Sequence, residues 1–137
     1  MTPAETYERY ERAAKALGKG GVSKKEWEDA LRGIIPEVGR GCTICYFSDY
    51  RAATITKVEF YKNGKPKAVE VTFNKVNCLD YYAGDYEILP ELDERPGAVN
   101  RFTLRRNGRW YEDGQETSPH SVVLMLHYQH HYIDPHY

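Results

Sequence analysis

The sequence predicts an α+β protein in which two N-terminal helices precede a small, curved antiparallel β-sheet or barrel. Apolar residues recur at helical spacing before residue 36 and alternate with a period near two from Thr43 onward. Asn-Gly pairs between alternating segments also indicate tight hairpins. We therefore divide the chain into a helical extension over residues 1–36, expected to serve oligomerisation or docking, and an antiparallel β ligand-binding domain over residues 37–137.

Capping signals define the two helices. Thr2-Pro3-Ala4-Glu5 forms a capping box with proline at the first helical position, which predicts a helix over Pro3–Leu17. Ser23 and Glu26 cap a second helix over Lys24–Gly33. Both apolar stripes are narrow, so we expect these helices to dock on the rest of the chain or on another subunit.

Alternating apolar residues define the strands that follow. Within the second of them the apolar positions change face, which predicts a bulge near Lys57. Asn63-Gly64 predicts a hairpin, Asn77–Gly84 is expected to be irregular, and Pro90–Gly97 to be a loop. The expected strands are Thr43–Phe47, Arg51–Tyr61, Ala68–Phe73, Tyr86–Leu89, Phe102–Leu104, Arg109–Tyr111 and Val122–Leu126.

Composition restricts the class of partner. The 137 residues include 19 Lys and Arg against 20 Asp and Glu, a net charge of −1, whereas proteins that follow duplex DNA are usually clearly basic. We therefore expect a small phosphorylated ligand and no polynucleotide partner.

No apolar run approaches the ~18 residues of a membrane span, and the N-terminus lacks the apolar core of a secretory signal. An odd number of cysteines, three, fits a reducing compartment, so a cytoplasmic protein without a membrane partner is expected.

The segment Arg106-Asn107-Gly108-Arg109 carries the strongest functional signal. A two-residue Asn-Gly turn predicts that Arg106 lies opposite Arg109, and that Arg105 lies opposite Trp110 in a cation–π contact. Like charges directly across a strand pair destabilise it by about 0.2–1 kcal/mol. A phosphate held by both guanidinium groups would offset this repulsion.

The alternative is that these arginines are solvated beside a surface turn and neutralised by Glu112 and Asp113. If the hairpin binds a nucleotide, its arginines hold the pyrophosphate, its asparagine pairs with a base edge or ribose, and a ring stacks on adenine. The residues expected in these roles are Arg105, Arg106 and Arg109, then Asn107, and then Phe102 or Tyr111.

Cysteine and histidine clusters offer weaker chemistry. Cys42 and Cys45 have the spacing of a zinc knuckle, but positions i and i+3 of a strand face opposite sides, which favours two core cysteines. The C-terminal His-Tyr segment is expected to dock on its own domain or on a neighbour. No nucleophile motif, paired-carboxylate signature or phosphate loop is present. We therefore expect no metal, no cofactor and no catalytic residue.

Four motifs in the second part of the chain read Gly41-Cys-Thr43, Ser48-Asp49-Tyr50-Arg51-Ala52-Ala53-Thr54, Phe102-Thr-Leu-Arg-Arg-Asn-Gly-Arg-Trp110 and Tyr132-Ile-Asp134-Pro135-His-Tyr137. These motifs resemble those of a family of small phage proteins, the first type of Thoeris anti-defence protein. They run from Gly41 to the C-terminus, and the hairpin motif is the most specific of them. The arginine that the family carries directly after Ser-Asp is Tyr50 here, and Arg51 follows one place later.

The resemblance implies a non-enzymatic sponge, a homo-hexamer assembled from dimers. It would bind cyclic ADP-ribose isomers such as glycocyclic ADP-ribose, made by a bacterial TIR-domain enzyme, and withhold them from the host effector. Some relatives hold cyclic di- or trinucleotides at separate sites. The resemblance adds Asp49 and Arg51 to the expected ligand-binding residues.

Two other functions stay open at this point. The first is a hydrolase that degrades the same cyclic nucleotide with His127 or His131 as general base. The second is an adaptor that binds a host protein or DNA through the helices predicted over Pro3–Leu17 and Lys24–Gly33.

Overall fold

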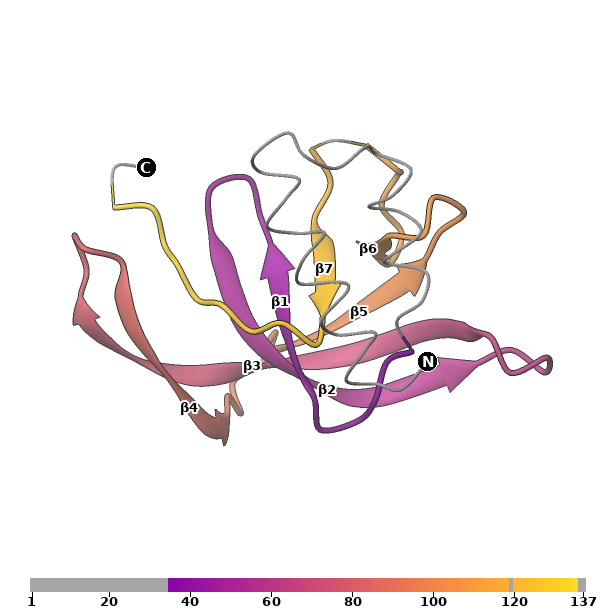
Figure 1. Ribbon diagram of the computed structural model, residues 1–137, viewed down its shortest axis with the longest axis horizontal. Helices are drawn as coiled ribbons and strands as arrows, with labels where there is room; N and C mark the ends of the chain where they lie inside the picture. Colours follow the sequence, from indigo (N-terminus) through magenta and orange to yellow (C-terminus); the bar gives the residue numbers. More distant parts are fainter. Residues whose placement is uncertain (1–34, 119, 136–137) are drawn as a thin grey trace.

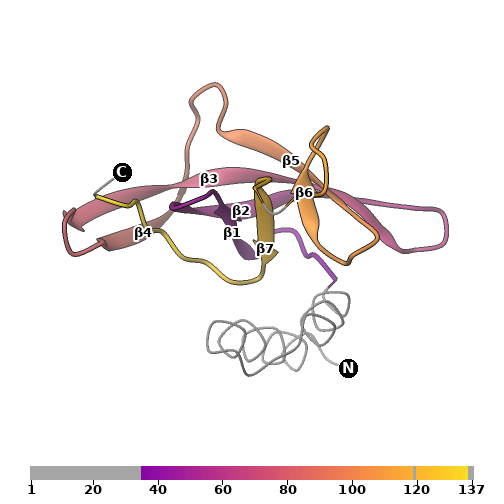
Figure 2. The same ribbon diagram turned by 90° about the horizontal axis from the view of Figure 1, so that it is seen from above.

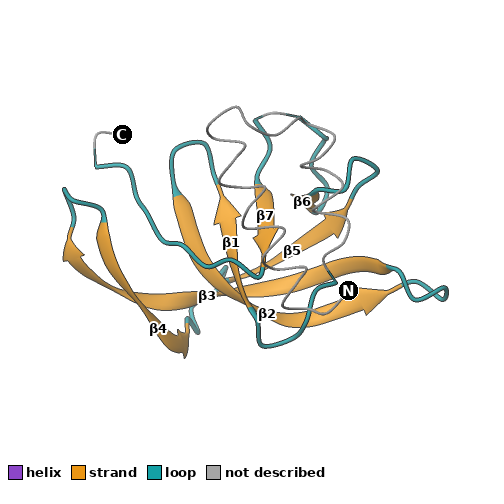
Figure 3. Cartoon of the chain, in the orientation of Figure 1, coloured by secondary structure: helices purple, strands orange, loops and turns teal. Residues whose placement is uncertain are grey.

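The computed structural model describes residues 35–118 and 120–135, and within these ranges the regular structure consists of strands (Figures 1 and 3). The strands are β1 (Gly41–Cys45), β2 (Tyr50–Phe60), β3 (Pro66–Asp80), β4 (Asp85–Leu92), β5 (Val99–Leu104), β6 (Trp110–Glu112) and β7 (Val123–Leu126). Across the described ranges no helix has the length and apolar content to cross a membrane.

Six of the strands close into an antiparallel barrel. The strand order is β2-β1-β7-β6-β5-β3-β4, and an additional pairing of β2 with β3 closes the ring, leaving β4 outside it. The predicted α+β class is therefore wrong, because the described part of the chain is all-β. A closed barrel buries its own apolar face and leaves no free edge, so it needs no helical layer to complete a core. The predicted helices Pro3–Leu17 and Lys24–Gly33 lie outside the described residues.

The barrel interior is filled by alternate residues of its strands. Ile55 pairs with Val71, and both side chains are fully buried. Trp110 pairs with Leu104 on one side and with Leu124 on the other, which brings β5, β6 and β7 into the same core. The predicted bulge near Lys57 is confirmed by a register shift between Ile55 and Lys57.

Strand β3 is far longer than the predicted Ala68–Phe73. Its first part lies between β2 and β5 in the barrel, and its second part, from Asn74, leaves the barrel paired with β4 alone. We call this two-stranded extension, residues 74–92, the arm; it projects to the left in Figures 1 and 2. Residues 77–80 are exposed, so no apolar alternation marked this segment in the sequence. The expectation of irregular structure over Asn77–Gly84 is therefore wrong for residues 77–80 and confirmed for the turn at 81–84, and the expected loop Pro90–Gly97 begins only after Leu92.

The C-terminal segment, residues 127–135, joins the barrel to the arm. Tyr132 pairs with Tyr50 through two backbone hydrogen bonds, of 2.7 and 2.8 Å, at the start of β2. The backbone N–H of Asp134 donates to Asp49 Oδ1 (2.9 Å). On the other side, a Cβ built on Gly84, in the turn of the arm, would lie 2.5 Å from the Tyr132 ring. The expected docking of this segment is confirmed.

Candidate functional site

A hollow lies where the barrel, the arm and the C-terminal segment meet. Its volume is about 680 Å³, within the range of roughly 300–1,000 Å³ that is common for small-molecule pockets. It is lined by Arg51 and Ala52 of β2, by residues 73–77 of β3, by Leu89 of β4, by residues 93–95 of the following loop, and by His131 and Ile133. A second cavity of about 310 Å³ adjoins it and shares four lining residues, Arg51, Phe73, Asp93 and Arg95.

Three cations and one phenylalanine ring line this hollow. The Arg51 guanidinium carbon lies 4.3 Å from the centre of the Phe73 ring, close enough for a cation–π contact. Lys75 and Arg95 complete the set. Arg51 pairs with Ile44 across β1 and β2, and Phe73 with Ala53 across β2 and β3, so both side chains face the barrel interior near its rim.

A carboxylate holds one of these cations in place. Asp93 accepts hydrogen bonds from the backbone N–H of Arg95 (2.9 Å) and from its guanidinium Nε (2.9 and 3.0 Å). The hydrogen bonds from Arg95 lower the pKa of Asp93 to about 2. Arg95 itself is largely exposed, so a ligand phosphate can reach its guanidinium without removing it from Asp93.

The imidazole of His131 forms part of the wall of the cavity. Its Nδ1 accepts the backbone N–H of Ala52 (3.3 Å), and its ring meets that of Tyr86 edge-on at 4.8 Å. Burial lowers the pKa of His131, and the nearby Arg51 lowers it further. The ring is therefore neutral at pH 7 with its proton on Nε2, which makes it a hydrogen-bond donor.

The Asn-Gly hairpin adopts a different register from the one predicted. Leu104, not Arg105, pairs with Trp110, because the loop has three residues. Gly108 N–H donates to Arg105 O (3.0 Å), Arg105 N–H donates to Arg109 O (2.9 Å), and Gly108 takes φ +84°. This is a turn followed by a glycine bulge, a common alternative to the two-residue turn. The predicted pairing of Arg106 with Arg109 is therefore wrong.

The new register changes the neighbours of the hairpin side chains. Arg105 lies over Tyr111, 5.7 Å from the ring centre, and not over Trp110, which is a core residue. Its Nε donates to Thr103 Oγ1 (2.8 Å) and its Nη2 to Glu112 O (3.3 Å). The guanidinium group expected to bind phosphate is thus already engaged within the hairpin.

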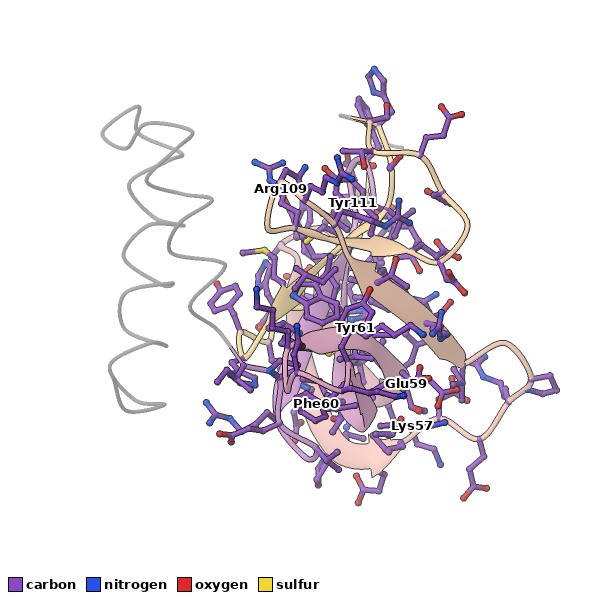
Figure 4. The ribbon with its side chains drawn as sticks, turned by 90° about the vertical axis from the view of Figure 1, so that its right-hand side faces the viewer. Lys57, Glu59, Phe60, Tyr61, Arg109 and Tyr111 are labelled. Atoms are coloured by element: carbon purple, nitrogen blue, oxygen red, sulfur yellow. The ribbon has the colours of Figure 1, made fainter. Side chains whose placement is uncertain are left out.

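The asparagine and the two rings expected to contact a ligand make their contacts inside the fold instead. Asn107 accepts the N–H of Arg109 through Oδ1 and donates through Nδ2 to the Tyr111 hydroxyl, both at 2.9 Å. Phe102 is fully buried in the core and Tyr111 is 3% exposed, so neither ring offers a face for stacking. Figure 4 shows Arg109 and Tyr111 on the same side of the barrel. Arg109 Nε is buried without a hydrogen-bond acceptor in the described part of the chain, so it keeps an unused donor.

Of the eight expected site residues, Arg51 alone lines the two cavities described here. Arg106 is an exposed residue of the hairpin loop. Asp49 anchors the C-terminal segment through Asp134. The sequence interpretation missed Phe73, Lys75 and Arg95, which come together only because β3 runs on from the barrel into the arm.

The other histidine considered as a general base, His127, and the cysteines Cys42 and Cys45 have structural surroundings, whereas Cys78 is exposed. His127 Nε2 accepts the backbone N–H of Glu37 (3.2 Å), and burial lowers the pKa of His127 to about 4. Cys42 lies in the core, while burial raises the pKa of Cys45 to about 12. Within residues 35–118 and 120–135, no three His, Cys, Asp or Glu side chains are placed to hold a metal ion.

Comparisons of the chain with protein-family models, with curated proteins and with solved structures found no match.

Proposed function

We propose that this protein is a phage anti-defence sponge that binds cyclic ADP-ribose-type signals, such as glycocyclic ADP-ribose, in the cytoplasm of the infected bacterium and holds them uncleaved. The observation that carries the proposal is the hollow of about 680 Å³ that is lined by the cations Arg51, Lys75 and Arg95 and by the Phe73 ring. The choice of a cyclic ADP-ribose isomer among the phosphorylated nucleotides rests on the family resemblance of the motifs in Gly41–Thr54 and Phe102–Trp110.

The lining matches such a ligand group by group. The forked donors of Arg51 and Arg95 suit the two charges of a pyrophosphate, for which paired guanidinium contacts are strong and oriented. Phe73 offers a ring for adenine once Arg51 turns toward the phosphates. Asn77, which is exposed on the cavity wall, and the Nε2–H of neutral His131 supply hydrogen bonds to ribose hydroxyls.

The histidine contacts favour storage over turnover. A neutral imidazole has one nitrogen lone pair, and a general base must offer it to the substrate. The lone pair of His131 accepts Ala52 N–H, and that of His127 accepts Glu37 N–H. Either ring would have to give up a backbone hydrogen bond to act as base.

The decisive variant is Arg51→Ala. Because a charge-assisted hydrogen bond contributes about 1.5–3 kcal/mol, we expect this variant to bind glycocyclic ADP-ribose at least ~10-fold more weakly by calorimetry, with little change in the free energy of unfolding. The matched control is Lys57→Ala, which removes an exposed cation from the same strand and away from the cavity. Equal affinity in the two variants would show that the cavity is not the site.

Arg109→Ala tests the hairpin separately, because Arg109 keeps a buried donor without an acceptor in the described ranges. Loss of affinity there, with Arg51→Ala unchanged, would move the ligand from the cavity to the hairpin. Storage itself is tested by loading the protein, denaturing it with heat and analysing the released molecule by mass spectrometry. An intact ligand supports the sponge, whereas a hydrolysed one would replace it by the hydrolase alternative.

A further inference from the structure

The two arginines of the cavity are restrained differently. Arg95 is fixed by Asp93, whose carboxylate accepts hydrogen bonds from its Nε and from its backbone N–H. No carboxylate within residues 35–118 and 120–135 forms an ion pair with Arg51, whose guanidinium lies over the Phe73 ring instead. Arg51 can therefore turn toward a new partner without leaving a carboxylate behind, whereas Arg95 is already fixed in its position.

The register of the sheet places Arg51 beside two rings. Phe73 pairs with Ala53, two residues after Arg51, so Arg51 and Phe73 are diagonal neighbours on the interior face of β2 and β3. On the other side, Arg51 pairs with Ile44 of β1, and Tyr46 follows Ile44 by two residues on the same face. Burial raises the pKa of Tyr46, while the charge of Arg51 and its hydrogen bond to the hydroxyl lower it. The guanidinium thus lies between a tyrosine and a phenylalanine near the rim of the barrel.

In this position Arg51 occupies the place that a stacked base would need. A cation and a purine bind a phenylalanine ring through the same π face, and Phe73 is partly buried against the barrel core. Arg51 and Phe73 line both cavities, so a ligand in either of them meets the ring beside the guanidinium. An uncharged nucleoside would have to displace Arg51 without offering its charge another partner. A nucleotide brings that partner itself, because hydrogen bonds between guanidinium and phosphate groups are stronger than a cation–π contact.

We propose that Arg51 is a gate on the Phe73 ring, which covers the ring until a phosphate draws the guanidinium away. The site then stacks a base only when a phosphate is bound as well, and it discriminates against free nucleosides and nucleobases. This inference rests on the proposed binding of a nucleotide in the cavity and adds the order in which its parts are recognised. Because a sponge acts through occupancy, a site that is closed to unphosphorylated nucleosides stays available to its signal.

The test titrates the full-length chain with adenosine and with ADP, each followed by ligand-observed NMR. Arg51→Ala should change the two affinities in opposite directions. Adenosine should bind this variant at least about threefold more tightly than wild type, because the ring is no longer covered. ADP should bind it at least about tenfold more weakly, because the phosphate contact is lost. A folding defect would weaken the binding of both probes, so opposite signs cannot arise from it.

Inorganic pyrophosphate tests the order of recognition. In wild type, saturating pyrophosphate should raise the affinity for adenosine about threefold, since it draws Arg51 from the ring. By linkage, adenosine should raise the affinity for pyrophosphate by the same factor. In Arg51→Ala the two probes should bind independently. Lys57→Ala, in the same strand but away from the cavity, is the matched control and should behave like wild type with every probe.

The outcomes separate the gate from the proposed function. If wild type binds neither ADP nor pyrophosphate, the cavity is not an anion site, and both proposals lose their basis. If wild type binds ADP but Arg51→Ala binds adenosine no more tightly than wild type does, the gate is overturned while the cavity remains the nucleotide site. Adding Phe73→Leu to Arg51→Ala should remove the gain in adenosine affinity. A gain that persists would place the base on another group and overturn the gate as well.

Discussion

His127 illustrates how much a single residue can depend on its surroundings. Among the described residues other than glycine, His127 is the one with a positive φ (59°), a conformation that few side chains adopt readily. The turn aims its ring into the protein, where Nε2 accepts Glu37 N–H and only 7% of the residue stays exposed. The sequence shows a histidine-rich segment but does not distinguish a buried hydrogen-bond acceptor from a catalytic base. The distinction depends on Glu37, which is 90 residues away in the chain.

This burial predicts a pH dependence of stability. The pKa of His127 falls from about 6.5 in the unfolded chain to about 4 in the fold, so the unfolded state binds more protons between these values. Stability is therefore full above about pH 6.5 and declines as the pH falls toward 4. We expect about 1–2 kcal/mol of this loss at pH 5 to come from His127.

His127→Asn removes the titrating group while keeping a residue that tolerates positive φ. Its free energy of unfolding, measured with urea at pH 7.5 and pH 5, should change less with pH than that of wild type. A residual slope from His131, whose pKa is also lowered, remains in both proteins. An identical pH slope in variant and wild type would contradict the assignment to His127.

At the scale of elements, both Asn-Gly hairpins were predicted and both exist, yet their register was not predictable from the dipeptide. In each, the asparagine Oδ1 accepts the N–H two residues later, at 3.0 Å in Asn63 and 2.9 Å in Asn107. Each glycine donates to the residue three positions before it. The same two letters permit a two-residue or a three-residue loop, and the choice depends on the strands that the loop must join. Because of this one-residue difference in loop length, Arg106 and Arg109 do not form the predicted cross-strand pair.

The turn of the arm gives an element-scale prediction through Gly84. A Cβ at this position would lie 2.5 Å from the Tyr132 ring, and φ is +67°. Gly84→Ala should therefore displace the C-terminal segment that joins the arm to the barrel, and weaken ligand binding. Gly64→Ala is the control, because φ is +84° but no heavy atom lies within 4 Å of its Cβ. We expect Gly84→Ala to lower the free energy of unfolding by about 1–3 kcal/mol more than Gly64→Ala in urea; equal losses would show that the Tyr132 contact contributes nothing.

At the scale of the whole molecule, the sequence predicted most of the strands but not how they close. The period of the apolar residues indicates which side chains are buried, whereas closure of the barrel requires β2 to pair with both β1 and β3. The candidate site was not predictable from the sequence either. Arg51 was among the expected residues, but Phe73 and Arg95 line the same cavity only through the path of β3 beyond the barrel and of the loop after β4. Long-range pairing of this kind leaves no local signature in the residues that take part.

The continuity of β3 through the barrel and the arm leads to a prediction about cooperativity. Residues 68–72 of β3 lie between two strands over a buried core, whereas residues 75–80 pair with β4 alone and are mostly exposed. The arm should therefore open locally at a free energy below that of global unfolding. In hydrogen exchange measured by mass spectrometry, peptides from 75–92 should exchange faster than peptides from 66–73, although one strand links them. Uniform protection along β3 would mean that the C-terminal segment ties the arm to the barrel as one cooperative unit.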